Sequence, residues 1–258
     1  MKNLCIIGPK WSGKTVFIYL FLHKLLFHKL LFHNGLKKKM LINFDDAIIR
    51  RLDSRIEDII DDGKWPSPTT RNEPARVIEL LFKKSNFFIN DKMICIPDVA
   101  GEIFEDLTEK ITKDQSKSLN AIKDADAYIL LVDSPELKEN GGGRFYRRFL
   151  TNFIEKINKP GFGKRCNKPL LVLLNKSDLI RKVKKLYGDP SGAEEYIKNN
   201  AALFYARIVN SFEPDMIDYA WHSSITNTLT DNAPDYDSLR KYDPIEYTKS
   251  IIQFLGKI

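Results

Sequence analysis

The sequence predicts an α/β fold in three layers, with a mostly parallel sheet of six strands and helices on both faces. Apolar runs of strand length recur along the chain, and four of them are near-continuous stretches of Val, Ile and Leu. Such stretches are typical of strands that are covered on both faces. Most of the intervening segments are long enough for crossover helices. The expected strands are Asn3–Ile7, Val77–Phe82, Met93–Ile96, Ala127–Val132, Leu170–Leu174 and Ile217–Trp221.

The second and third runs are separated only by the short polar segment KKSNFFIND, so we expect them to pair as an antiparallel hairpin. A helix is expected to begin near Lys14. Apolar residues at helical spacing between Asp45 and Asp61 predict an amphipathic helix within an insertion near 36–62. Pro190 is expected to open a helix that runs to about Val209, and Pro244 a final helix. No linker rich in Gly, Ser or Pro divides the chain, so we expect a single domain over residues 1–258.

The composition is that of a globular protein with a proper core, with 43% hydrophobic and 29% charged residues among 258. The three cysteines lack paired spacing, which favours a reducing compartment and a cytoplasmic location. The stretch MKNLCIIGPK reaches glycine and lysine before the apolar region of a signal peptide could form. Polar residues also interrupt the apolar runs before membrane-spanning length, so we expect no transmembrane segment.

The net charge of +7 is the one unusual feature of the composition. Basic runs lie at 36–40, 144–149 and 181–185. They would suit peripheral contact with an anionic membrane, nucleic acid or an acidic protein, and a solvated lysine-rich surface is the alternative. No signature of an RNA-binding module favours the nucleic-acid interpretation.

The first expected strand runs directly into GPKWSGKT, residues 8–15. Its glycines let the backbone curl until consecutive N–H groups point at phosphate oxygens, and the following helix adds its positive N-terminal dipole. Lys14 would reach the β- and γ-phosphates and the Thr15 hydroxyl would ligate Mg²⁺. The nucleotide-binding residues expected here are Gly8, Lys10, Trp11, Ser12, Gly13, Lys14, Thr15 and Val16.

Two further expected strands end in residues that could bind other parts of a Mg²⁺-bound nucleotide. In MICIPDVAGE, Asp98 could hold Mg²⁺ through a water, and Gly101 would let the backbone approach the γ-phosphate. In PLLVLLNKSDL, Asn175, Lys176 and Asp178 follow another buried strand. The Asp178 carboxylate can accept from N1–H and the exocyclic amine of guanine, a donor pair that adenine lacks. Ligands of open α/β sheets bind outside the carboxyl ends of the strands, where all three motifs fall.

Through GPKWSGKT, DVAGE and NKSD the chain resembles the Ras-like small GTPases of the translation-factor-related class of P-loop NTPases. The resemblance covers most of the chain. The long insertion, GKWPSPTT and DVAGE look similar to the double-GTPase-like group found mainly in prokaryotes.

The resemblance implies three further elements. A threonine of the first switch completes the Mg²⁺ shell, and GKWPSPTT offers Thr69, which we prefer, and Thr70. A guanine-contacting loop follows the sixth strand, where Ser223, Ser224 and Ile225 stand in place of the family's Ser-Ala-Lys. Ordering and release of the switch loops signals the nucleotide state.

Catalysis departs from the family pattern at two positions. Glu102 replaces the glutamine that orients the attacking water, and it adds negative charge beside a γ-phosphate. Lys10, where many relatives have glycine, could offset that charge. We therefore expect slow intrinsic hydrolysis that depends on Lys14, Glu102 and Lys10, with Arg71 or Arg76 as a candidate for an arginine finger in cis.

The leading hypothesis is a GTP-binding protein that hydrolyses GTP to GDP with Mg²⁺ and acts as a conformational switch for an unknown protein effector or regulator. The first alternative is a nucleotide-binding scaffold with negligible hydrolysis. The second is an adenine-nucleotide enzyme with a fortuitous NKSD, which would not discriminate against ATP.

Overall fold

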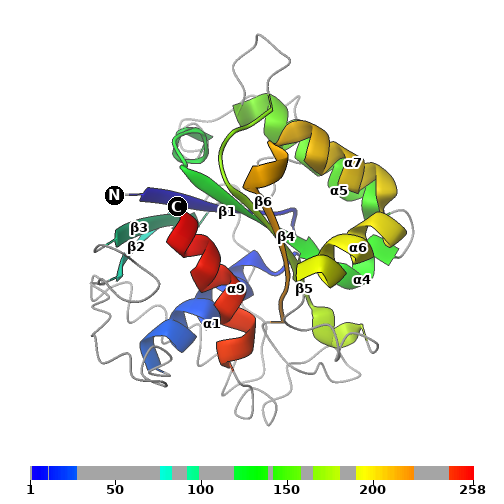
Figure 1. Ribbon diagram of the computed structural model, residues 1–258. Helices are drawn as coiled ribbons and strands as arrows, with labels where there is room; N and C mark the ends of the chain where they lie inside the picture. Colours follow the sequence, from blue (N-terminus) through cyan, green and yellow to red (C-terminus); the bar gives the residue numbers. More distant parts are fainter. Residues whose placement is uncertain are drawn as a thin grey trace.

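A six-stranded sheet in the order β2-β3-β1-β4-β5-β6 forms the centre of the protein (Figure 1). The computed structural model describes residues 2–10, 12–27, 76–82, 92–98, 119–138, 142–157, 165–180, 190–223 and 244–258. The strands are β1 (Lys2–Ile7), β2 (Arg76–Phe82), β3 (Lys92–Asp98), β4 (Ala127–Asp133), β5 (Leu170–Asn175) and β6 (Ile217–Trp221). β2 pairs antiparallel with β3, and the other neighbouring strands pair in parallel. The parallel sheet confirms the predicted α/β class.

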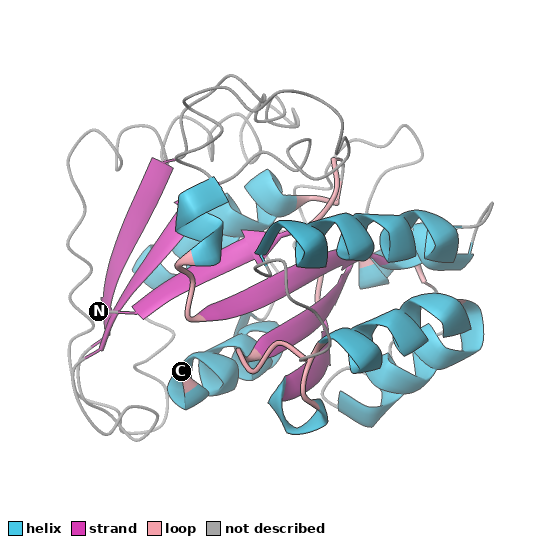
Figure 2. Ribbon diagram, turned by 90° about the horizontal axis from the view of Figure 1, so that it is seen from above, coloured by secondary structure: helices cyan, strands magenta, loops and turns pink. Residues whose placement is uncertain are grey.

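Helices cover both faces of this sheet (Figure 2). They are α1 (Lys14–Phe27), α4 (Ser134–Lys138), α5 (Gly142–Ile157), α6 (Pro190–Asn200), α7 (Ala202–Ser211) and α9 (Pro244–Lys257). Two 3₁₀ turns, η2 (Ser177–Leu179) and η4 (Pro214–Met216), follow β5 and precede β6. The helix predicted within the insertion near 36–62 lies outside the described residues. None of the helices within the described ranges has the length and apolar character to cross a membrane.

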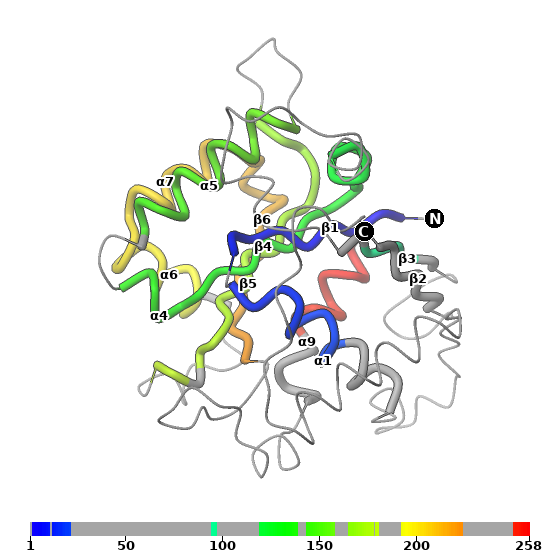
Figure 3. Tube along the Cα trace, turned by 180° about the vertical axis from the view of Figure 1, so that it is seen from behind, coloured from blue at the N-terminus to red at the C-terminus, as the bar shows by residue number. Residues whose placement is uncertain are grey.

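The alternation of side chains along the strands divides the core into two clusters, one on each face. Cys5 and Ile7 of β1 belong to a cluster with α5, α6 and α7. Leu4 and Ile6 of the same strand belong to a cluster with α1 and α9. Figure 3 shows α1 and α9 together on the side opposite α5 and α7. Every residue of β4 and β5 is buried, as expected for strands between two helical layers.

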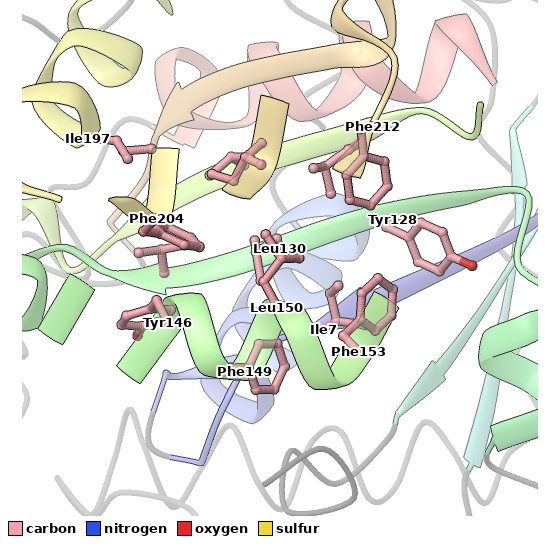
Figure 4. Packing of buried hydrophobic residues seen from close by; sticks show 14 of the residues in the cluster. Ile7, Tyr128, Leu130, Tyr146, Phe149, Leu150, Phe153, Ile197, Phe204 and Phe212 are labelled. Atoms are coloured by element: carbon pink, nitrogen blue, oxygen red, sulfur yellow. The ribbon is translucent and has the colours of Figure 1, made fainter. Parts of the chain in front are cut away.

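The cluster under α5 is rich in aromatic rings (Figure 4). Tyr128 of β4 packs edge-on against Phe153 of α5, with ring centroids 5.1 Å apart. Its hydroxyl donates to the carbonyl oxygen of Ile122 at 3.0 Å, so the buried polar end is satisfied. This packing holds α5 firmly on the sheet, with one end of the helix near the end of β4.

The single helix expected from Pro190 to about Val209 is wrong, because the structure has two helices there. The break falls at Ala201, which has φ −148° and ψ 54° and is not helical. Ala201 packs so closely on α5 that a Cβ added at Gly143 would lie 2.8 Å from the alanine Cβ. The change of direction lets α7 lie beside α5 (Figure 1).

Candidate functional site

The carboxyl ends of β1, β3, β4, β5 and β6 lie along one edge of the sheet, because these strands are parallel neighbours. β1 lies inside the sheet, with β3 on one side of it and β4 on the other, so the strand order reverses at β1. This reversal of strand order marks the point where open α/β sheets bind their ligands. The loop of residues 8–13, between β1 and α1, lies at this point, and we call it the phosphate loop.

Two glycines of the phosphate loop stand where no side chain fits. A Cβ at Gly8 would lie 2.7 Å from the Ser12 hydroxyl oxygen and 2.8 Å from the Leu131 carbonyl oxygen. Gly13 has φ +87°, and a Cβ there would lie 2.6 Å from the Asn175 side-chain nitrogen. Glycine alone adopts such a φ at little cost and permits such a close approach. The loop is therefore a tight backbone cradle pressed against the ends of β4 and β5.

Lys14, the first residue of α1, turns its ammonium back over the phosphate loop. Its Nζ donates to the carbonyl oxygens of Gly8 at 2.7 Å and Pro9 at 2.8 Å. The residue is only 9% exposed. A positive charge is thus held inside the curl of the loop at the N-terminus of a helix, and both features favour an anion.

Two buried polar atoms where the phosphate loop meets the end of β5 have no hydrogen-bond partner among the described residues. They are the Ser12 hydroxyl oxygen and the Asn175 Oδ1. An unsatisfied buried polar group is unfavourable by about 1–3 kcal/mol, and a ligand can remove that penalty. The Ser12 hydroxyl that can donate, the Lys14 ammonium and the tight loop between two glycines fit a phosphate-bearing ligand.

Asn175 joins the phosphate loop to the loop after β5, which we call the NKSD loop (residues 175–178). Its side-chain Nδ2 donates to the Ser12 carbonyl oxygen at 3.1 Å. The backbone carbonyl oxygen of Asn175 accepts from the Ser134 hydroxyl at 2.6 Å. Both ends of the residue are therefore fixed, one to the phosphate loop and one to the start of α4.

The NKSD loop is also tied to the end of β6. The Ser177 hydroxyl donates to the His222 carbonyl oxygen at 2.8 Å, and the Ser177 backbone N–H donates to the same oxygen at 3.2 Å. The His222 ring packs edge-on against Phe17 of α1 at 5.0 Å between centroids. The next residue, Ser223, is 1% exposed. The structure therefore brings the loops after β1, β5 and β6 together.

Lys176 has the left-handed backbone conformation, with φ 57° and ψ 32°. Its Nζ lies 2.5 Å from the Asp133 Oδ2. Sequence reasoning missed Asp133, although AYILLVD ends in a carboxylate just as MICIPD does. A carboxylate at the end of a buried apolar run was the sequence signal that could have identified Asp133. Its meaning depends on strand register, since Asp133 pairs with Asn175 across β4 and β5.

Behind Asp133, a buried tyrosine connects this edge to α5. The Asp133 backbone N–H donates to the Tyr146 hydroxyl at 2.7 Å, and that hydroxyl donates to Glu136 Oε2 at 3.5 Å. Burial raises the pKa of Glu136 above its ordinary value, and the negative charge of the nearby Asp133 carboxylate adds to this rise. Burial likewise raises the pKa of Tyr146, which stays a neutral hydroxyl.

The remaining predicted residues are described in part or not at all. Asp98 is the last residue of β3 and Asp178 lies in η2, each with only its backbone described. Lys10, Thr15 and Val16 lie in the phosphate loop and the first turn of α1. Arg76 begins β2 and pairs with Asp98 across the two strands. The predicted residues Trp11, Thr69, Thr70, Arg71, Gly101, Glu102, Ser224 and Ile225 lie outside the described residues.

Several solved structures are similar to this chain at low sequence identity. One is the signal recognition particle receptor SRb-GTP/SRX complex from Chaetomium thermophilum, with 14% identity, 100% of this chain and 98% of that chain covered, and a TM-score of 0.49. The Arl6 BBS3 small GTPase from Trypanosoma brucei has 14% identity, 99% and 97% coverage, and a TM-score of 0.42. The S. cerevisiae Ski7 GTPase-like domain bound to GTP has 16% identity, 96% and 50% coverage, and a TM-score of 0.46.

No curated protein matches the sequence. A protein-family model does match it, over residues 2–220, and that family is described as Double-GTPase 2. The matched range begins with β1 and ends within β6, so it includes the phosphate loop, the strand that ends at Asp98 and the NKSD loop. The chain belongs to the Double-GTPase 2 family.

Proposed function

We propose that this chain is a single guanine-nucleotide-binding domain over residues 1–258 that hydrolyses GTP to GDP with Mg²⁺ and switches conformation with the bound nucleotide. Membership of a GTPase family and the parallel α/β fold support GTP binding. The observation that carries the proposal is the 3.1 Å hydrogen bond from Asn175 to Ser12, which couples the phosphate loop to the NKSD loop.

The phosphate loop would hold the phosphate groups. Its backbone N–H groups and the Ser12 hydroxyl are the donors, and Lys14 supplies the positive charge. Thr15, Thr69 and Asp98 would hold Mg²⁺, because hydroxyl and carboxylate oxygens are the ligands that this cation prefers. When bound, Mg²⁺ would neutralise charge that develops on the phosphate oxygens.

The NKSD loop and the end of β6 would bind the base. Asp178 would accept the two donors of guanine, while the long stem of Lys176 offers apolar contact to a planar ring. Ser223, Ser224 and Ile225 would complete this pocket. The hydrogen bonds from Ser177 to His222 support a common base site, because they fasten the loops after β5 and β6 to one another.

For hydrolysis, Glu102 would orient the attacking water by accepting a hydrogen bond from it, with Gly101 allowing the backbone to approach the γ-phosphate. Glu102 lacks the amide donor of a glutamine, and its charge opposes the approach to an anion. Lys10 would offset this charge from the phosphate loop. We infer slow intrinsic turnover, tuned by Lys10 and Glu102. Glu102 also motivates the second candidate function, a scaffold that binds nucleotide but scarcely hydrolyses it.

The deciding experiment is a titration of the purified protein with fluorescent GTP, GDP and ATP in Mg²⁺, followed by phosphate release in a single turnover. We expect guanine-selective binding with slow but measurable release. Asp178→Asn should abolish the selectivity against ATP, which separates a genuine guanine site from a fortuitous NKSD. Equal affinity for ATP and GTP would contradict the proposal, whereas guanine binding without release over hours would favour the scaffold.

The basic run at 144–149 supports a peripheral contact of the proposed cytoplasmic protein. Arg144, Arg147 and Arg148 are exposed on α5, opposite its buried aromatic face. A contact with an anionic membrane or nucleic acid predicts binding to anionic vesicles or to RNA that weakens as salt rises. Absence of both interactions at low salt would leave the arginines as a solvated surface.

A further inference from the structure

The carboxylate of Asp133 makes contacts on two sides next to the NKSD loop. Asp133 ends β4 and pairs in register with Asn175 at the end of β5. Its side chain is 11% exposed and that of Lys176 is 37% exposed, and the two charged groups are 2.5 Å apart. The contact is charge-assisted, and the carboxylate that makes it is largely buried while the lysine remains partly exposed.

Asp133 makes two further hydrogen bonds, one through its side chain and one through its backbone. Its Oδ1 accepts from the Glu136 backbone N–H at 3.4 Å. Its own N–H donates to the hydroxyl of the fully buried Tyr146. The carboxylate therefore has one oxygen toward the start of α4 and the other toward Lys176.

Lys176 has a backbone conformation that needs support. It is the one residue other than glycine with positive φ among the described ranges. For a side chain such as lysine this conformation is unfavourable by about 1–2 kcal/mol, and it persists where neighbouring contacts determine it. The ion pair with Asp133 is such a contact. Because Lys176 lies between Asn175 and Ser177, the pair supports the backbone conformation of the NKSD loop.

We propose that Asp133 is a positioning residue for the base site: through its ion pair with Lys176 it holds the NKSD loop in the conformation that receives a guanine base. This inference rests on the proposed function. A loop that is already ordered loses little freedom on binding, and such preorganisation mostly lengthens the residence time. Asp133 itself need not touch the nucleotide.

The test uses Asp133→Asn, which keeps the size of the side chain and an oxygen for the Glu136 N–H but removes the charge. We expect the Kd for fluorescent GDP to rise about tenfold, chiefly through faster dissociation. Competition by inorganic pyrophosphate, which has no base, should be unchanged. A general loss of structure would weaken both ligands, so equal weakening of both would overturn the proposal.

A double-mutant cycle with Lys176→Met tests whether Asp133 acts through the lysine. We expect Asp133→Asn to add nothing in the Lys176→Met background, and additive effects would overturn the proposal. Asp218→Asn is the matched control. It removes the charge of an exposed ion pair, Asp218 Oδ1 with Lys257 Nζ at 2.6 Å, which lies away from the site. It should leave the GDP affinity unchanged.

Asp133→Glu, which retains the charge, should bind GDP more tightly than Asp133→Asn, and it provides the comparison with wild type if the asparagine variant does not fold. If Asp133→Glu matches wild type in its GDP dissociation rate while Asp133→Asn is faster, the proposal holds. If wild type binds GDP and neither variant changes that rate, this inference fails and the proposed function stands. If wild type binds no guanine nucleotide, both fail.

Discussion

The Asn175 amide nitrogen donates to the Ser12 carbonyl oxygen at 3.1 Å, which joins two loops that are 163 residues apart in the chain. The same nitrogen lies 2.6 Å from the position that a Cβ on Gly13 would occupy. The two loops are thus in direct contact as well as hydrogen-bonded, so we expect a change in one loop to disturb the other.

Gly13→Ala should disturb both loops at once. The new methyl group would displace the Asn175 amide, and alanine is strained at φ +87°. We expect a loss of about 1–3 kcal/mol in the free energy of unfolding, together with strongly weakened GDP binding. Denaturant unfolding and a GDP titration measure the two effects.

Gly143→Ala provides the control, because its Cβ would meet Ala201 at 2.8 Å within the helical layer. It should reduce stability while leaving the GDP affinity of the folded protein intact. Equal losses of affinity in both variants would contradict the assigned role of Gly13.

Lys14→Gln should weaken binding of phosphate-bearing ligands. Glutamine keeps a donor for the Gly8 and Pro9 carbonyl oxygens but removes the charge inside the phosphate loop. Hydrogen bonds to charged groups contribute about 1.5–3 kcal/mol, so we expect GDP affinity to fall about 10- to 100-fold. Isothermal titration measures this, with Lys257→Gln as a surface control. An unchanged affinity would remove Lys14 from the site.

Glu102→Gln should speed hydrolysis. In the proposed site the substitution would restore an amide donor and remove a negative charge near the γ-phosphate, so the barrier from charge repulsion should fall. Single-turnover phosphate release at saturating GTP measures the rate, and Lys10→Gln should slow it. A rate that is unaffected or lost in Glu102→Gln would refute the charge argument.

Glu136→Gln should stabilise the protein at neutral pH. The pKa of Glu136 is raised in the folded state, chiefly by burial, so the folded state binds more protons than the unfolded state between the two pKa values. Stability contributed at this position is therefore complete below the unfolded pKa and falls as the pH rises through the folded pKa. Glutamine does not titrate, so the two unfolding curves should differ at pH 7 and converge below about pH 4.

Elements whose evidence lies within one short segment could be predicted from the sequence. The strands followed from continuous apolar runs, and GPKWSGKT marked the turn from β1 into α1. The break at Ala201 was missed although Asn199 and Asn200, which are typical of helix ends, come directly before it. The close packing of Ala201 against Gly143 of α5 is a contact between helices that no local pattern shows.

Asp133 could not be predicted in the way that Asp178 could. Asp178 belongs to a contiguous motif, whereas the role of Asp133 depends on which residue of β5 lies opposite it. That register places it beside Asn175 and within reach of Lys176. Contacts between segments that are 43 residues apart are determined by packing, which no local pattern records.

The hydrogen bonds from Ser177 to the His222 carbonyl oxygen have a consequence for biosynthesis. His222 follows Ser177 by 45 residues, so the ribosome makes the first part of the base site well before the residue that fastens it. At about 5–20 residues per second, this interval lasts roughly 2 to 9 s. During it, the residues of β1, the phosphate loop and β5 have been synthesised, but His222, which follows β6 and anchors the NKSD loop, has not. The proposed base site should therefore become complete only late in translation, after the residues that follow β6 have been made.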